Sequence, residues 1–355
     1  MISILDFYIA RIIIQQTLLA FAVLLGLFIF VTFIDQLGDL GVNEFGIADA
    51  IRYVLLTIPR TIYELFPMAA LLGSMLGLSL LANDSELTVM RASGLSVFQI
   101  AAAVLKVGVM FALINVLLGE FVTPTTETMA QRGRAEALQR HIKQQTDFGL
   151  WMKDSKTYVN VGEVLPDLTL LRLRIIEFDD DDRLRAFAYA ERGEFDNPEW
   201  RLVDVRQTLV DEEGNANPQF VDAAVWRTNV TPEILSVFLI KPDQLSIWQL
   251  SQYVTHLSTN SQDTERYELA FWSKLFLPLS TAVMVILAIP FVFQQLRSGG
   301  LGRNLFIGIM LGVGFYVVDR GFGNIVQVYD IPPFLGALMP VTAFALLAIF
   351  MLRRI

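Results

Sequence analysis

The sequence predicts an α-helical membrane protein with six transmembrane helices and one inserted β domain. Hydrophobic residues make up 54% of the 355 residues and the mean hydropathy is +0.50, which is too apolar for a water-soluble chain. Charged residues still make up 18%, so part of the chain is expected to lie in water. The long apolar runs form two groups of three, separated by a polar middle rich in turn residues.

Crossing a hydrocarbon core of ~30 Å takes ~20 apolar residues in a helix. The segments that meet this requirement are Ile12–Ile34, Tyr53–Leu81, Val97–Val122, Phe271–Phe293, Leu305–Val318 with its flanks, and Pro333–Leu352. We therefore expect three spans in residues 1–124, an inserted domain in 125–266, and three spans in 267–355. The first ten residues carry Asp6 and lack a small-residue cleavage site, so they are interpreted as an interfacial lead-in that is retained.

A short amphipathic helix is expected at residues 83–94, between the second and third spans. Asn83 is a suitable N-cap with Glu86 three residues later, which predicts a capping box, and Gly94 suits the position past the helix end. The apolar Leu87, Val89 and Met90 among the charged Asp84, Glu86 and Arg91 could offer a hydrophobic knob to an ATPase. The alternative is an ordinary polar turn between two spans.

The basic residues of the short loops and tails predict the orientation in the membrane. Under a six-span topology, one side holds Arg11, Arg91, Arg297, Arg303, Arg353 and Arg354. On the opposite side, the segment Asp35–Asp49 has acidic residues and no Lys or Arg. The positive-inside bias therefore places both termini and residues 83–94 in the cytoplasm and the inserted domain on the far side, which is the periplasm in a bacterium.

The insert is predicted to be an antiparallel β domain, either a small sandwich or an open jelly roll. Strands are expected at Thr157–Val161, Leu168–Phe178, Leu184–Tyr189, Trp200–Val210 and Gln219–Thr228, which alternate apolar with polar residues or are rich in β-branched ones. Turn-rich sequences separate them. Helical stems, Thr125–Gln144 and Ser246–Arg266, are expected to join the domain to the third and fourth spans.

Basic residues also recur at the predicted outer membrane face, where the positive-inside bias disfavours them. They are Arg52, Arg60, Arg132, Arg134, Arg140, Lys143, Arg266 and Lys274. We interpret Arg60, Arg132 and Arg134 as candidates for binding a phosphate-bearing substrate. For Arg60 the alternative is an ion pair with Glu64, one helical turn later. Lys106, in the third span, is expected to snorkel or to pair with a helix of a partner subunit.

Little in the sequence points to catalysis. The chain has no cysteine and two histidines, His141 and His256, and it lacks a phosphate-binding Gly-x-x-x-x-Gly-Lys-Ser/Thr motif. We expect no cofactor and no metal. The acidic residues, which give a net charge of −9, argue against a nucleic-acid partner. The spacings Gly73-x-x-x-Gly77 and Gly308-x-x-x-Gly312 predict close helix packing.

Several motifs resemble the lipopolysaccharide-export permease family LptF/LptG, with LptG favoured over LptF. The most specific is Ser85–Gly94. The others are Phe33–Leu37, Phe66–Gly73, Gly149–Asp154, Ala270–Lys274, Leu296–Ser298 and Ile331–Pro333, so the resemblance extends over essentially the whole chain.

The resemblance implies a six-helix permease subunit of the Gram-negative inner membrane with a periplasmic β-jellyroll. Such a subunit pairs with LptF and with two copies of the ATPase LptB, and LptC receives the lipid. Lipopolysaccharide enters between the two permease subunits through lateral gates formed by first and fifth spans. The cytoplasmic coupling helix of the family corresponds here to residues 83–94. The chain itself is then a non-catalytic subunit of an ATP-driven transporter.

The chain departs from the family pattern at the outer end of the first span. Many relatives carry a lysine there, where this chain has Val31, Thr32 and Phe33. We therefore expect substrate contacts from Arg60 and Arg134 instead of from the first helix.

Two other function classes remain as alternatives. A membrane-anchored periplasmic lipid-binding scaffold would need the spans only as anchors, and it would not bind an ATPase. An ion-coupled secondary transporter would need ionisable groups near the bilayer midplane in broken helices, which Lys106 alone does not supply.

Overall fold

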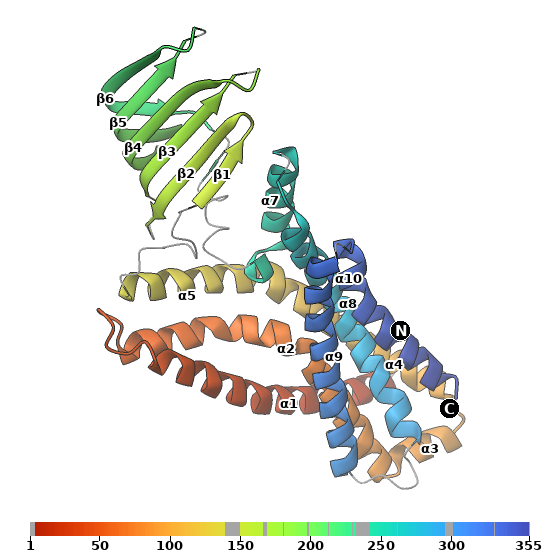
Figure 1. Ribbon diagram of the computed structural model, residues 1–355. Helices are drawn as coiled ribbons and strands as arrows, with labels where there is room; N and C mark the ends of the chain where they lie inside the picture. The colour runs from red at the N-terminus through yellow and green to blue at the C-terminus, as the bar shows by residue number, and fades with distance from the viewer. Residues whose placement is uncertain are drawn as a thin grey trace.

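The computed structural model describes residues 4–138, 150–165, 169–179, 181–196, 199–211, 213–228, 230–231, 242–260, 262–294, 301–329 and 331–354. A helical part and a β sheet lie at opposite ends of the molecule, with helix α7 (Ile247–Thr259) between them (Figure 1). Among the described residues six helices are long and apolar enough to cross a membrane. The predicted fold class is confirmed.

The spans are α1 (Ile4–Leu37), α2 (Ile47–Asn83), α4 (Val97–Leu117), α8 (Glu265–Gln294), α9 (Leu301–Tyr329) and α10 (Pro333–Leu352). Four of the six predicted spans lie within longer helices, the third corresponds to α4 with the π-helical turn after it, and the sixth has the same bounds as α10. A π-helical turn, η1 (Leu118–Val122), continues α4 into α5 (Thr123–Ala137), which is the first predicted stem. Arg140, His141 and Lys143 lie outside the described residues.

The helices differ in how far they are covered by the rest of the chain. In the most apolar stretch of α2, 78% of the residues are buried, whereas the share is 11% in α1 and 17% in α9. Helix α2 therefore forms the centre of the membrane part. The first and fifth spans leave apolar faces uncovered.

Both predicted glycine contacts are present. A Cβ on Gly73 would overlap the backbone of Thr17 in α1, and a Cβ on Gly77 would lie 3.2 Å from the Cα of Ile13. On α9, Gly308 and Gly312 face the side chains of α2, with Met68 Cγ 2.7 Å from a Cβ placed on Gly312. The glycines thus let α1 and α9 approach α2 closely.

The β domain is one antiparallel sheet of six strands paired in chain order. Its strands are β1 (Leu150–Asp154), β2 (Thr157–Val164), β3 (Leu170–Phe178), β4 (Leu184–Asp196), β5 (Glu199–Val210) and β6 (Ala216–Trp226). The inserted antiparallel β domain is confirmed. Its described strands form one meander sheet, without the second sheet of a sandwich or the crossed strand order of a jelly roll. Strand β1 was not predicted from the sequence.

The strands curve, and one face of the sheet holds the domain core (Figure 1). Trp200 is the largest side chain of this core, and its indole N–H donates to the carbonyl oxygen of Val230 at 2.7 Å. Arg172 in β3 and Asp204 in β5 have positive φ. In each strand the buried residues are even-numbered before this position and odd-numbered after it, so the alternation of inward and outward side chains shifts there by one residue. Such irregular positions increase local bending, as the curved sheet requires.

The second predicted stem is divided into two helices. After the 3-10 turn η2 (Pro242–Gln244), α7 begins at a capping box in which Ser246 and Gln249 exchange hydrogen bonds with each other's backbone. It ends at Thr259, and α8 begins at Glu265. At the end of α7, the side-chain oxygen of Asn260 accepts a hydrogen bond from the Ser155 N–H at 2.7 Å, which ties α7 to the β1–β2 turn.

Candidate functional site

The segment between the second and third spans contains a short helix, α3 (Glu86–Ala92). The predicted capping box is wrong: α2 continues to Asn83, and the N-cap of α3 is Ser85, which has φ 60° and makes no side-chain capping bond. A two-residue turn, Asp84–Ser85, thus separates the two helices. Gly94, at φ +95°, ends the segment as expected.

The apolar side chains of α3 point in two directions. Leu87 is fully buried and Met90 is 9% exposed, and both belong to the core formed by the membrane helices. Val89 is 65% exposed. Of the three apolar residues expected in the outward knob, only Val89 lies there, because Leu87 and Met90 fasten α3 to the membrane core.

The charged residues of α3 flank this outward position. Asp84 and Arg91 are exposed, and Glu86 is half-buried. The Tyr8 hydroxyl donates to Glu86 Oε1 at 2.9 Å, so the beginning of α1 contacts α3. Lys106 forms an ion pair with Asp6 of α1 at 2.6 Å, so it has a partner within this chain.

At the other end of the spans, Arg60 is surrounded by carboxylates. Its guanidinium lies 2.8 Å from Glu64, 3.5 Å from Glu127 on α5 and 3.5 Å from Asp243 on η2. The alternative of an ion pair with Glu64 is confirmed. Glu127 is fully buried, so removal of Arg60 would leave a buried carboxylate without its charge partner.

The two arginines of α5 have different surroundings. Arg134 forms an ion pair with Asp39 at 2.5 Å and lies over the Tyr53 ring, 5.3 Å from its centroid. Arg132 is exposed and has no ion pair within the described part of the chain. Of the three candidate substrate residues, Arg132 is thus the one whose charge is open to a ligand.

A cavity of about 390 Å³ lies beside this cluster, between α2, α8 and α9. Apolar side chains such as Leu65, Leu277 and Phe315 line it together with the charged Lys274 and Arg320. The Lys274 side chain is nearly buried and donates to the carbonyl oxygen of Leu245.

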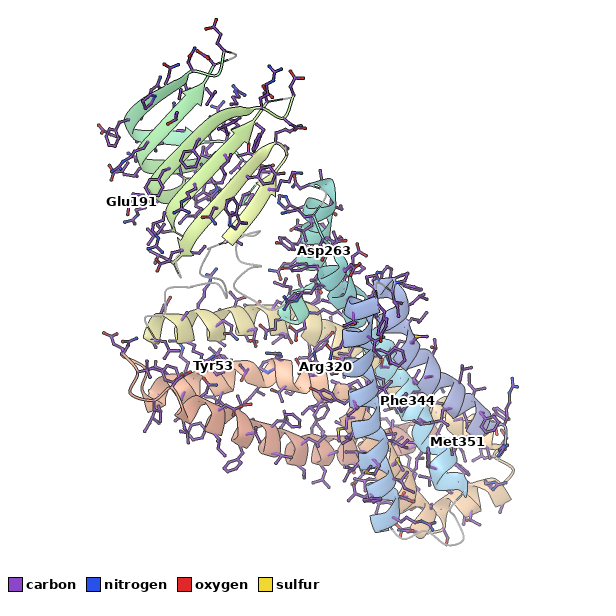
Figure 2. The ribbon with its side chains drawn as sticks, viewed as in Figure 1. Tyr53, Glu191, Asp263, Arg320, Phe344 and Met351 are labelled. Atoms are coloured by element: carbon purple, nitrogen blue, oxygen red, sulfur yellow. The ribbon has the colours of Figure 1, made fainter. Side chains whose placement is uncertain are left out.

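Arg320 was not among the residues predicted from the sequence. Figure 2 shows it where α9 passes α2, and it lies 3.8 Å from Glu64 and 3.9 Å from Asp243. The available signal was its position two residues after the apolar run Leu305–Val318. An arginine there is costly unless it has a partner or faces a cavity.

Comparison with known proteins decides the family. Residues 7–354 match the family model described as lipopolysaccharide export system permease LptF/LptG. This chain belongs to the LptF/LptG family. Among its curated relatives, the lipopolysaccharide export system permease protein LptG of Escherichia coli (strain K12) is 39% identical over 99% of this chain and 98% of its own length. LptG of Haemophilus influenzae (strain Rd) is 34% identical over 100% of this chain and 99% of its own.

In this LptF/LptG chain, the two charged regions lie at opposite ends of the helices. Helix α3 is at the end away from the sheet, and the cluster around Arg60 is at the end near α7 (Figure 1). The family match covers both regions. The E. coli and H. influenzae relatives place the chain on the LptG side of the family.

Proposed function

We propose that this chain is a permease subunit, of the LptG type, of a lipopolysaccharide export system in the bacterial inner membrane. The observation that carries the proposal is the 39% identity to E. coli LptG over nearly the full length of both chains. The six membrane-length helices agree with it. As a permease, the chain would serve as a non-catalytic member of a multi-subunit transporter.

The proposed orientation places both termini and α3 in the cytoplasm and the β domain in the periplasm. The basic residues of the short loops support this orientation. In this arrangement residues 1–124 and 267–355 form the membrane part, and residues 125–266 form the periplasmic part with its stems. The separation of α3 from the sheet by the length of the spans is consistent with it (Figure 1).

We propose that α3 is the coupling helix for an LptB-type ATPase dimer. Val89 would enter a pocket of the ATPase, with Asp84, Glu86 and Arg91 as charged contacts at its edge. Leu87 and Met90 would not contact the ATPase; by packing on the membrane core they would fix the orientation of α3 towards it. An interface anchor of this kind usually lies in a desolvated pocket surrounded by polar contacts.

The uncovered faces of α1 and α9 are proposed to meet an LptF-type partner and to border the path of the lipid. Large exposed apolar side chains on these helices include Val23, Leu27 and Phe30 on α1 and Phe306, Met310 and Val317 on α9. Lipid or a partner helix can cover such faces in a membrane, so the same surfaces can open to lipopolysaccharide and close again. The β domain would pass the lipid towards LptC.

The phosphate groups of the substrate are proposed to contact the outer basic residues. Arg132 can bind directly because its charge is not neutralised by a described neighbour. Arg60 and Arg134 would have to exchange a carboxylate for a phosphate, so their contribution depends on a rearrangement of their ion pairs.

Two substitutions on α3 distinguish its contact with the ATPase from its packing on the membrane helices of this chain. Val89→Asp should lower the amount of ATPase that copurifies with the complex, because loss of an interface anchor typically costs more than ~1 kcal/mol of binding free energy. Thermal stability of the membrane part should not change. Leu87→Ala should instead lower the melting temperature, because a buried Leu→Ala change costs about 2 to 5 kcal/mol.

Val225→Asp is the matched control, since Val225 is 61% exposed on β6, far from α3. It should leave the ATPase content unchanged. Wild-type ATPase content and lipid export in the Val89→Asp variant would refute the coupling role of α3. A complex that never retains an ATPase would favour the membrane-anchored scaffold.

A further inference from the structure

A line of polar contacts crosses the outer ends of the helices. It begins in the loop after α1, passes over α5 and α2, reaches η2 and ends on α9. In order, its members are Asp39, Arg134, Tyr53, Gln131, Glu127, Arg60, Glu64 with Asp243, and Arg320. The two least covered spans, α1 and α9, are thus connected through this line.

The first half of the line is made of short contacts. Arg134 pairs with Asp39 and lies over Tyr53. The Gln131 side-chain amide donates to Glu127 at 2.7 Å and to the Tyr53 hydroxyl at 3.3 Å. These contacts hold α5 against α2 and against the α1–α2 loop.

In the second half, two carboxylates each lie between two arginines. Glu64 is 2.8 Å from Arg60 and 3.8 Å from Arg320. Asp243 is 3.5 Å from Arg60 and 3.9 Å from Arg320. Since Asp243 belongs to the segment that returns from the β domain, these ion pairs connect α9 to that segment through α2.

The returning segment is also fastened to the membrane part by contacts that do not involve α9. Lys274 of α8 donates to the Leu245 carbonyl oxygen. The Glu120 carboxylate, from η1, accepts hydrogen bonds from the backbone N–H groups of Ile247 at 2.8 Å and Trp248 at 3.3 Å. These contacts hold the segment to α8 and η1 independently of its ion pair with α9.

The contacts of Arg320 are the longest ion pairs in the line, and its side chain is 49% exposed. Exposed ion pairs are weak and exchange readily with water. If Arg320 withdrew, Glu64 and Asp243 would each still have Arg60 within 3.5 Å, so neither carboxylate would lose its only cation. Breaking the Arg320 link therefore costs less than removing Arg60, because Glu64 and Asp243 each keep a cation beside them.

We propose that Arg320, with Glu64 and Asp243, is a separable ionic link that holds the outer end of the fifth span against the segment returning from the β domain. Arg320 is a positioning residue: it keeps α9 close to α2 while the lipid path is closed, and it releases α9 when the path opens. The proposal rests on the proposed function only in giving α9 a role in the lipid path.

The position of α9 can be measured directly, because the chain has no natural cysteine. One spin label is attached at Val328→Cys on α9 and the other at Trp248→Cys on α7, and the distance between them is measured. The native side chains at these positions are 73% and 68% exposed. In the complete transporter with cysteine-free partners, Arg320→Gln should shift the nucleotide-free distance distribution to longer and broader values. Arg320→Lys, which keeps the charge, should restore most of the original distribution.

Arg192→Gln is the matched control. Arg192 is also 49% exposed and also pairs with a carboxylate, Glu194, but it lies on β4. It should leave the distances unchanged. An Arg320→Gln distribution equal to that of the wild type would overturn the proposal.

The functional test uses Asp243→Cys with Arg320→Cys, joined by a short reducible bifunctional thiol reagent. The joined complex should lose ATP-driven lipid release and recover it when the crosslink is reduced. In a separate measurement, Arg320→Gln should change the release rate by about two- to fivefold, the effect expected from loss of one partly exposed ion pair. Normal release from the joined complex would overturn the proposal. Failure of the proposed function would appear differently, as a wild-type complex that neither retains an ATPase nor releases lipid.

Discussion

The contact between α1 and α2 at Gly73 supports a quantitative prediction for Gly73→Ala. A Cβ at this position would meet Thr17 through its backbone: its distance to the Thr17 nitrogen would be 2.5 Å, where ordinary contacts are 3.4–4 Å. A backbone clash cannot be relieved by rotating a side chain. The two helices would have to separate along their shared face.

The expected cost follows from two opposing effects. Alanine in place of glycine inside a helix normally stabilises it by about 1 kcal/mol. Overpacking of a tight contact costs about 1 to 3 kcal/mol, and a clash with backbone belongs at the upper end of that range. We therefore expect Gly73→Ala to lower the free energy of unfolding by about 2 kcal/mol.

The assay is unfolding of the purified chain in detergent, by heat or by titration with a denaturing detergent. Gly26→Ala on α1 and Gly314→Ala on α9 are the controls, since a Cβ at either position has nothing within 4 Å. Both should be as stable as the wild type or slightly more stable. If Gly73→Ala is as stable as Gly26→Ala, the close contact between α1 and α2 is not as described.

Two further predictions concern the basic residues near α7 and the junction between α7 and the sheet. Arg132→Glu should reduce crosslinking to lipopolysaccharide without a change in melting temperature. Arg60→Glu should lower both the crosslinking and the melting temperature, because it places a negative charge beside buried Glu127. Equal loss of stability in the two variants would contradict this distinction. Burial between α7 and β1 lowers the pKa of His256, with Asp154 acting in the opposite direction. The folded chain therefore binds fewer protons there than the unfolded chain, so the stability of this junction is full above a pH of about 6.5 and decreases as the pH falls through that value. Faster hydrogen exchange of the α7 amides at the lower pH should measure this, and His256→Gln should weaken the dependence.

The features that were predicted correctly depend on local sequence. Whether a segment can cross a membrane is decided by the length of its apolar run, and five of the six strands are visible as alternating or β-branched segments. Strand β1 was missed because Leu150–Asp154 is short and becomes a strand by pairing with β2. The Asn83 capping box failed because α2 continues through Asn83.

The functional residues were predicted less completely, for a physical reason that differs between the two ends. On α3, the residue types were identified, but the packing of Leu87 and Met90 on the membrane core decides that Val89 faces outwards. At the end of the helices near α7 (Figure 1), Arg60 was singled out by its depth in a span. Its neutralisation by Glu127 and Asp243, and the presence of Arg320 beside them, required the fold.

By itself, the sequence determined that this chain has six apolar segments of membrane-spanning length, a β domain between the third and the fourth, and the Ser85–Gly94 motif that resembles the LptF/LptG family. These properties follow from the hydropathy and residue pattern of contiguous segments, which do not depend on the rest of the chain. Only the tertiary structure decided which faces of α1 and α9 stay uncovered and which charges are neutralised. Ion pairs such as Arg320 with Glu64 join residues that are distant in the chain, and their partners are chosen by helix packing.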